Sequence, residues 1–207
     1  SSIAEAARTV DADLGHANAN LIGLVNNAGI GLHSRAGGGI KALSDAQQTF
    51  DVNVLGVLRL SEAFIPLLAQ QTAGTEAQRA GGQPKGRVVN VGSLAGRAYR
   101  PNDISYVASK HAVEGLTDVM RLDLQPQGIS VSLIQPGFVQ SGMCNHGGCL
   151  AFPNTTTTPA IVDALLAPYP RTRYAVSDVH GIPASAALLM SFLPDRLKDV
   201  IVLLFES

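Results

Sequence analysis

The sequence is poor in cysteine and carries no excess of charge of either sign. Two Cys among 207 residues exclude a small fold stapled by several disulfide bonds. The 15 basic residues are balanced by 16 acidic ones and form no long block, which argues against a dedicated nucleic-acid-binding protein. Apolar types nevertheless make up 46% of the chain. This composition favours a sizeable core and argues against intrinsic disorder.

Long hydrophobic runs are also missing. The longest lie near residues 184–193 and 200–205, and both are shorter than the ~20 residues that a membrane-spanning helix needs. The chain begins without Met and without a charged-then-apolar leader, so no targeting signal is visible. The compartment stays open between the cytoplasm and the periphery of an organelle membrane. A length of 207 residues suits one domain, over residues 1–207, better than two.

Three short apolar runs alternate with longer segments of helical periodicity. Continuous apolar runs are typical of strands that are buried on both faces of a sheet, and strands separated by helices predict parallel pairing through crossovers. The fold class is therefore predicted as α/β, with a doubly wound, Rossmann-like parallel sheet. The predicted strands are residues 21–25, 87–91 and 129–134, and the predicted helices are residues 3–14, 46–71 and 104–124.

Two further features of the sequence add detail to this prediction: a proline inside a predicted helix, and a weaker pattern of helices and strands in the last third of the chain. Pro66 lies inside the second predicted helix, where we expect a kink or a change of pitch. Residues 159–166 predict a short helix and residues 173–176 a further strand. Two more helices are expected over residues 184–193 and 195–205, separated by a Pro.

Polar residues follow the predicted strands at the carboxyl ends, where ligands bind in doubly wound sheets. Near them, Tyr106 and Lys110 are four residues apart and so share one face of a helix. An ammonium beside a phenol lowers the phenol pKa from about 10, which lets a Tyr exchange a proton with a hydroxyl or carbonyl group. Ser93 could donate a hydrogen bond to the same oxygen. Taken alone, the Tyr–Lys pair equally fits two ordinary residues of a helix surface.

The order of several motifs is more specific than any one of them. Asn-Asn-Ala-Gly ends the first predicted strand, Ser93 follows the second, Tyr-Val-Ala-Ser-Lys begins the third helix, and Pro136-Gly137 follows the third strand. In combination they resemble the short-chain dehydrogenase/reductase family over about residues 3–142. The runs 87–96, 173–174 and 194–197 are similar to the branch that acts on steroids, retinoids and related lipophilic alcohols.

The resemblance implies a role for each matching residue. Tyr106 would be the catalytic acid/base, and Lys110 would lower its pKa and bind the nicotinamide ribose. Ser93 would polarise the substrate oxygen, and Asn53 would hold a water in a proton relay from Lys110. Other positions would stabilise the sheet or contact the cofactor, and these are Asn26, Ala28, Gly29, Pro136, Gly137 and Ser141. Capping or turn roles for Asn53 and Ser93 stay open.

The implied activity is that of an NAD- or NADP-dependent oxidoreductase. It would transfer a hydride between the nicotinamide cofactor and a secondary alcohol or ketone, of a lipophilic, steroid- or retinoid-like kind. Residues 143–170 would cover the substrate, and helices 46–71 and 105–125 would pair in a homodimer or homotetramer. No metal is expected, because Cys144, His146 and Cys149 lack a fourth ligand nearby. Membrane association through the C-terminal tail would rest only on short apolar runs.

One departure from the family pattern is large. The glycine-rich cofactor turn that follows the family's first strand has no counterpart among the 25 residues ahead of Asn26, which hold one predicted helix. The Gly29-Ile30-Gly31 run does not replace it, because no helix opens there. We therefore expect the C-terminal part of a longer enzyme, or a truncated product that binds the cofactor poorly. The alternative is a catalytically silent fragment or pseudoenzyme that acts only through dimerisation.

Overall fold

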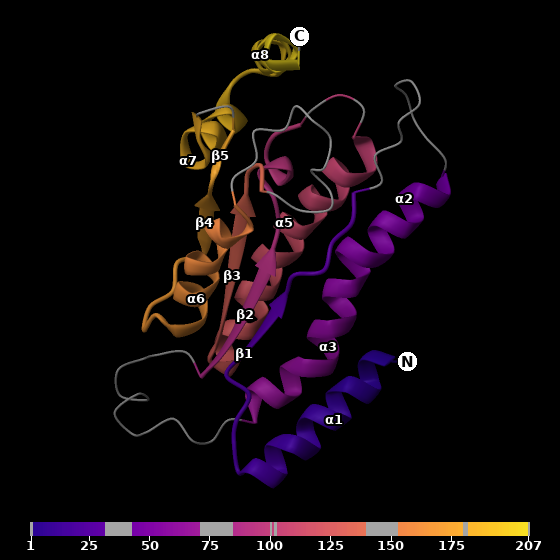
Figure 1. Cartoon of the computed structure of the whole chain (residues 1–207), viewed down its shortest axis with the longest axis vertical. Coiled ribbons are helices and arrows are strands. Elements are labelled where there is room, and N and C mark those ends of the chain that lie inside the picture. The colour runs from indigo at the N-terminus through magenta and orange to yellow at the C-terminus, as the bar shows by residue number, and fades with distance from the viewer. Residues whose placement is uncertain are drawn as a thin grey trace.

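The computed structural model describes residues 2–31, 43–70, 85–99, 101, 103–139, 153–179 and 182–206. At its centre lies a parallel four-stranded sheet in the order β1-β2-β3-β4 (Figure 1). The strands are β1 Gly23–Asn26, β2 Gly86–Val91, β3 Ile129–Pro136 and β4 Arg173–Val176. The predicted strands and the α/β fold class are confirmed, since β1 pairs with β2, β2 with β3 and β3 with β4, all in parallel.

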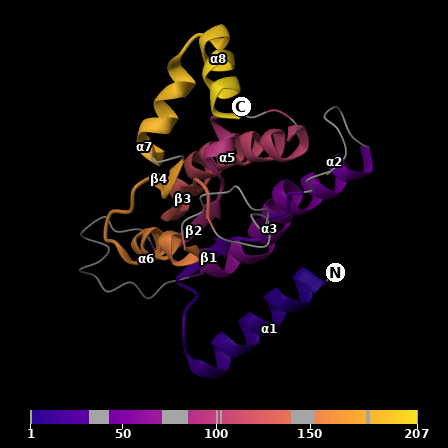
Figure 2. The ribbon, with the colours of Figure 1, turned by 45° about the horizontal axis from the view of Figure 1, so that its top comes forward.

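Helices cover both faces of this sheet. On one face α3 (Gly56–Ala69) packs against β1 and β2, α5 (Ile104–Leu124) packs against β3, and α1 (Ser2–Ala17) contacts α3. On the other face lies α6 (Thr158–Leu166), which contacts β2 and β3. Figure 2 shows α6 and α3 on opposite sides of the strands. Burial on both faces explains the continuous apolar runs of the strands.

The core is accordingly split in two by the sheet. Val88 points to the cluster that contains Leu68 of α3, whereas the next residue, Val89, points to the cluster that contains Ala164 of α6. All four side chains are fully buried. The alternation of side chains along a strand thus places two successive valines of β2 in two separate cores.

The second predicted helix is continuous but changes its pitch. It consists of α2 (Leu43–Phe50), a π-helical turn η1 (Asp51–Leu55) and α3. The expected change of pitch at Pro66 is wrong, because α3 runs through Pro66 to Ala69 as an α-helix, and the kink expected there as the alternative stays a prediction. The wider turn lies at η1, where the amide of Gly56 donates to the carbonyl of Asp51. By length and composition Ser44–Ala69 would also suit a membrane span, but its Leu68 lies in the core.

The third predicted helix is confirmed at both ends as α5. It is followed by a 3₁₀ turn, η3 (Gln125–Gln127), and by Gly128. Gly128 has a φ of 74°, a left-handed conformation that glycine adopts without steric cost. This turn leads directly into β3, so α5 and β3 are held side by side.

The C-terminal third continues the pattern with short elements. A 3₁₀ turn η5 (Asn154–Thr157) precedes α6, and a hairpin of β5 (Asp178–Val179) and β6 (Ile182–Pro183) follows β4. The helix expected over residues 184–193 is α7 (Ala184–Ala187) continued by a 3₁₀ segment, η6 (Leu188–Phe192). The last helix is α8 (Asp195–Glu206).

The region expected to cover the substrate is described only in part. Residues 143–152 lie outside the described residues. Of the rest, α6 buries Ala164 and packs Ile161 and Leu165 against the sheet, while Val162 and Leu166 are exposed. The described helix therefore makes the contacts of a core helix, and the covering role of residues 143–170 stays a prediction.

Candidate active site

Tyr106 and Lys110 lie in the first turns of α5, beside the carboxyl end of β2. The Lys110 ammonium lies 5.6 Å from the centroid of the Tyr106 ring, and it donates a 3.0 Å hydrogen bond to the carbonyl of Val91, the last residue of β2. Lys110 is only 4% exposed. This burial lowers the pKa of Lys110 to about 8, because removal from water disfavours the charged form. The predicted pairing of Tyr106 and Lys110 on one helix face is thus present.

Asn53 lies in the π-helical turn η1, and its side chain is almost fully engaged by the protein. Its Oδ1 accepts a 2.8 Å hydrogen bond from the amide of Ile30, and its Nδ2 donates to the Ile30 carbonyl at 2.9 Å and to Ser109 Oγ at 3.0 Å. Ser109 Oγ in turn donates to the carbonyl of Tyr106 at 2.7 Å. Asn53 therefore fixes the loop after β1 to the turn of α5 that carries Tyr106. The water relay remains a prediction.

Ser109 belongs to this arrangement although the sequence reasoning assigned it no role. It is fully buried and lies between Tyr106 and Lys110 in the sequence. π-Helical turns are rare and are frequent at functional sites, so the turn around Asn53 marks the same region. The available signal was the position of this Ser in the Tyr-Val-Ala-Ser-Lys run, directly before Lys110.

Gly29 brings the loop after β1 close to the same pair of side chains. A Cβ at position 29 would lie 3.5 Å from Asn53 Oδ1 and 3.5 Å from Lys110 Nζ. Ala28, just before it, is exposed. The structure thus brings Gly29, Asn53 and Lys110 together, and Ala28 lies at the rim of the same loop.

Asn26 has a different surrounding from the rest of its motif. It is 2% exposed, and its Nδ2 donates to Asn90 Oδ1 at 2.8 Å and to Ser61 Oγ at 3.2 Å. Asn90 Nδ2 continues the chain of hydrogen bonds to Thr117 Oγ1 at 3.0 Å. These contacts join β1, β2, α3 and α5, so Asn26 links the sheet to the helices on one face.

Ser93 lies in the turn between β2 and a 3₁₀ segment, η2 (Leu94–Gly96). Its Oγ accepts a 3.1 Å hydrogen bond from the amide of Ala95 and lies 3.5 Å from the carbonyl of Pro136. The segment packs tightly on α5, because a Cβ at Gly96 would lie 2.8 Å from the carbonyl of Lys110. Ser93 is therefore held between the end of β3 and the turn of α5 that carries Lys110.

Pro136 and Gly137 end β3 at the same edge of the sheet. The amide of Gly137 donates to the carbonyl of Val176 at 3.0 Å and to Ser177 Oγ at 3.1 Å. A Cβ at Gly137 would lie 2.8 Å from the carbonyl of Asp178, so a larger residue would push the chain apart. Ser141, expected to face the cofactor, lies outside the described residues.

No group of three or more His, Cys, Asp or Glu side chains suits a metal ion in the part of the chain that the structure describes. The Cys144, His146 and Cys149 group lies outside the described residues.

Comparison with known proteins identifies the family. The family model for short chain dehydrogenases matches residues 1–147. The chain belongs to the short-chain dehydrogenase family. The fold agrees, since a short-chain dehydrogenase of Burkholderia cenocepacia in complex with NADP superposes with a TM-score of 0.74 at 20% identity, over 97% of this chain and 73% of that one. An NADPH-bound carbonyl reductase from chicken fatty liver is 25% identical, with a TM-score of 0.64, over 80% of this chain and 65% of that one.

Curated relatives of similar sequence include dehydrogenases that are named for hydroxylated substrates. A 3beta-hydroxysteroid dehydrogenase of Caenorhabditis elegans is 34% identical over 62% of this chain and 30% of its own length. The mitochondrial D-beta-hydroxybutyrate dehydrogenase of Rattus norvegicus is 33% identical over 65% of this chain and 35% of its own length. The chain thus spans about a third of the length of these relatives. The resemblance inferred from the sequence motifs is confirmed.

Proposed function

We propose that this chain carries the catalytic residues of an NAD- or NADP-dependent oxidoreductase that interconverts a secondary alcohol and a ketone. The observation that carries the proposal is the position of the buried Lys110 ammonium, 5.6 Å from the Tyr106 ring centroid, at the carboxyl edge of the sheet where ligands of such folds bind. The membership in a dehydrogenase family and the hydroxyl-oxidising relatives support it.

Each residue has one task in the proposed reaction. In alcohol oxidation the Tyr106 phenolate oxygen accepts the proton of the substrate hydroxyl, and in ketone reduction the phenol returns it. Lys110 favours the phenolate through its positive charge. Ser93 Oγ donates a hydrogen bond to the same substrate oxygen. The bound nicotinamide supplies the other half of the chemistry, because it exchanges a hydride with the substrate carbon.

The residues present fit the nicotinamide end of the cofactor. Lys110 carries three donor hydrogens, of which one goes to Val91, and it lies beside Gly29, which has no side chain. A ribose with its two hydroxyls matches this donor set. For the pyrophosphate, a glycine-rich turn between a strand and a helix is the usual binding element, and described residues 2–22 hold α1 and no such turn.

The proposed contacts follow from this fit. Tyr106 and Lys110 would hold the nicotinamide ribose. The other proposed contact residues of described position lie at the same edge of the sheet or in the loops beyond it, and they are Asn26, Ala28, Gly29, Pro136 and Gly137. Ser141, which lies outside the described residues, is proposed from the sequence motif alone.

For the substrate we propose a lipophilic secondary alcohol of the steroid or retinoid kind. Hydroxysteroid dehydrogenases among the relatives support this choice, whereas the hydroxybutyrate dehydrogenases act on a small polar acid by their names. A 3β-hydroxysteroid, a 17β-hydroxysteroid and 3-hydroxybutyrate, each offered with NAD⁺ and NADP⁺, separate the two classes. Turnover of 3-hydroxybutyrate in preference to both steroids would contradict the lipophilic assignment.

Association of two or four copies is part of the proposal. Large apolar side chains on α3 and α5 are exposed, among them Leu58, Val119 and Leu122. Light scattering at several protein concentrations tests it, and a monomer at all of them would contradict it.

The decisive experiment replaces the proposed acid/base. Tyr106→Phe removes only the transferable proton, so turnover should fall about 10²–10⁴-fold with little change in the melting temperature. Tyr99→Phe is the matched control, because the Tyr99 hydroxyl donates to Asp199 of α8 at 2.8 Å and takes no part in the proposed site, and it should leave turnover unchanged. A Tyr106→Phe protein with near-normal turnover would overturn the assignment. A folded parent chain that turns over none of the three probes would favour the silent, dimerising alternative.

A further inference from the structure

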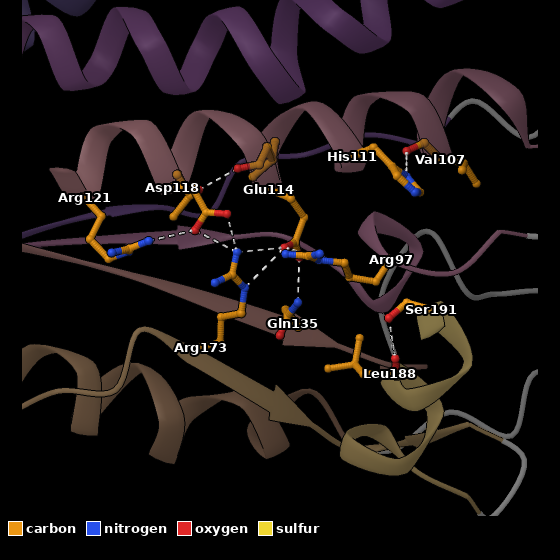
Figure 3. A network of polar contacts seen from close by, with 12 residues as sticks. Arg97, Val107, His111, Glu114, Asp118, Arg121, Gln135, Arg173, Leu188 and Ser191 are labelled. Carbon is orange, nitrogen blue, oxygen red and sulfur yellow. Dashed lines mark hydrogen bonds and ion pairs between the residues drawn. The ribbon is translucent and has the colours of Figure 1, made fainter. Parts of the chain in front are cut away.

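Glu114 is a buried carboxylate one helical turn beyond Lys110, and it contacts three separate elements. Its Oε2 accepts a 2.8 Å hydrogen bond from Arg97 Nε and lies 3.3 Å from Arg173 Nη2, while its Oε1 accepts a 2.6 Å hydrogen bond from Gln135 Nε2 (Figure 3). Arg97 follows η2, Gln135 belongs to β3 and Arg173 to β4. One side chain of α5 thus joins the three elements that surround the proposed active site.

The surroundings of Glu114 compensate its burial. Glu114 is 4% exposed, and a carboxylate so far from water is tolerated only when it is paired and hydrogen-bonded. Two guanidinium groups and a buried amide meet this need. Arg173 is shared with Asp118, one turn further along α5, at 2.7 Å and 2.8 Å.

Asp118 lies in the same network but makes different contacts. It accepts from Arg173 and, at 3.3 Å, from Arg121, as Figure 3 shows. Within the described residues no hydrogen bond or ion pair joins it to Arg97 or to Gln135. Asp118 therefore ties α5 to β4 alone, whereas Glu114 also ties α5 to η2 and to β3.

The contacts of Glu114 lead directly to Ser93. A Cβ at Gly96 would lie 2.9 Å from Glu114 Cγ and 2.8 Å from the carbonyl of Lys110, so η2 sits on the side chain of Glu114 as well as on the backbone of α5. Ser93 caps this segment. Gln135 immediately precedes Pro136, whose carbonyl lies 3.5 Å from Ser93 Oγ.

We propose that Glu114 is a positioning residue that fixes Ser93 relative to Tyr106 and Lys110. The proposal rests on the proposed function for the roles of Ser93 and Tyr106. Glu114 does not touch the reacting atoms in this account. It holds η2 through Arg97 and the end of β3 through Gln135, so that the Ser93 hydroxyl and the Tyr106 phenol face the same substrate oxygen.

Hydrogen exchange of the backbone amides tests the structural part without any ligand. The amides of Ala95, Gly96, Arg97 and Ala98 are all hydrogen-bonded within the segment 93–98, so their exchange reports how firmly it is held. Glu114→Gln should speed their exchange at least about tenfold, since it removes a charge-assisted hydrogen bond. Asp118→Asn is the matched control and should leave these amides within about twofold of the parent chain. Equal effects of the two variants, or none, would overturn the proposal.

A double-mutant cycle tests the positioning itself. Turnover is measured for the parent chain, Glu114→Gln, Ser93→Ala and the double variant, with the hydroxysteroid probe and saturating cofactor. If Glu114 acts through Ser93, the loss caused by Ser93→Ala should shrink at least about threefold in the Glu114→Gln background. Additive losses would overturn the positioning role. Failure of the proposed function would show instead as a Tyr106→Phe variant with normal turnover.

A second variant keeps the proposal testable if Glu114→Gln does not fold. Arg97→Gln removes only the ion pair that links Glu114 to η2. Because the Arg97 side chain is 42% exposed, we expect this variant to fold. It should reproduce the faster exchange of residues 95–98 while leaving Gln135 and Arg173 on Glu114. Unchanged exchange in Arg97→Gln would contradict the proposed path from Glu114 to Ser93.

Discussion

Lys110 and Glu114 are two buried charges one turn apart on α5, and the protein treats them in opposite ways. Each is 4% exposed. Glu114 receives two guanidinium groups and an amide, whereas Lys110 has the carbonyl of Val91 and the face of a Tyr ring. In the described part of the chain no carboxylate forms an ion pair with Lys110.

This difference separates a charge that holds the fold from a charge that is available for chemistry. The electric field of a fully paired ion is largely cancelled by its partners, so it has little effect on other groups. An ammonium without a counterion keeps its field for a neighbouring phenol and for a ligand, and its cost to stability appears as a lowered pKa. Residues kept for function at a cost in stability are expected at active sites.

The largest effect on stability is expected from removing the paired charge. Glu114→Leu leaves the buried Nε2 of Gln135 without its acceptor and leaves Arg97 and Arg173 without their shared carboxylate. We expect a loss of about 2–3 kcal/mol in the free energy of unfolding, reduced from the full cost of breaking a buried pair because the two Arg side chains are partly hydrated. Urea unfolding measures it. A loss below about 0.5 kcal/mol would mean that Glu114 is not the centre of the network.

Removing the charge of Lys110 should instead raise the free energy of unfolding. Burial lowers the pKa of Lys110 from 10.5 to about 8, which corresponds to about 3 kcal/mol of destabilisation by the charged form. Lys110→Met removes this cost and also the hydrogen bond to Val91, worth about 1 kcal/mol. We therefore expect a gain of about 2 kcal/mol at pH 7, together with a loss of activity.

The pH dependence of this gain follows from the direction of the pKa shift. Below pH 8 the ammonium is charged in both the folded and the unfolded chain, so the cost of burying it is complete. Between pH 8 and 10.5 the folded chain has lost the proton while the unfolded chain still holds it, so the parent chain gains stability as the pH rises. Unfolding of the two proteins at pH 7 and pH 10 should show the advantage of Lys110→Met disappearing, and a constant advantage would contradict this explanation.

The smallest effect is expected at Asp118, which is partly exposed. Burial alone would raise the pKa of Asp118, but hydrogen bonds from Arg173 and Arg121 hold it below its ordinary value. Its contribution is therefore present above the ordinary carboxyl range and is lost as the pH falls through the lower folded-state pKa. Asp118→Asn should cost less than about 1 kcal/mol at pH 7 and nothing at pH 2. A cost as large as that of Glu114→Leu would remove the distinction between the two carboxylates.

Much of the fold could be predicted from the sequence because its signals are local. The apolar spacing and the turn at Gly128 define α5, whose bounds match the prediction at both ends. The same helix geometry places Tyr106 and Lys110 together, since four residues make one turn. Ser93 and Gly29 follow the carboxyl ends of neighbouring parallel strands, and this was enough to predict that they lie at the same edge of the sheet.

What could not be predicted depends on contacts between distant residues. The sequence predicted a kink or a change of pitch at Pro66, whereas the π-helical turn lies around Asn53, where two hydrogen bonds to Ile30, 23 residues away, accompany the wider turn. Glu114 looks in the sequence like an ordinary charge of a helix surface. Its partners Arg97 and Arg173 are 17 and 59 residues distant, so only the folded chain shows that it is buried and paired.

Lys110 is a buried ammonium that forms no ion pair within the described residues, and this description can be tested by titrating it directly. The chain has four Lys, so selective ¹³C labelling of lysine gives few NMR signals, and Lys110→Met assigns the one of interest. We expect that signal to titrate near pH 8, below the ordinary lysine value of about 10.4. A Lys110 signal that titrates near that ordinary value would show that the ammonium is neither desolvated nor held back for the phenol, and would contradict the account.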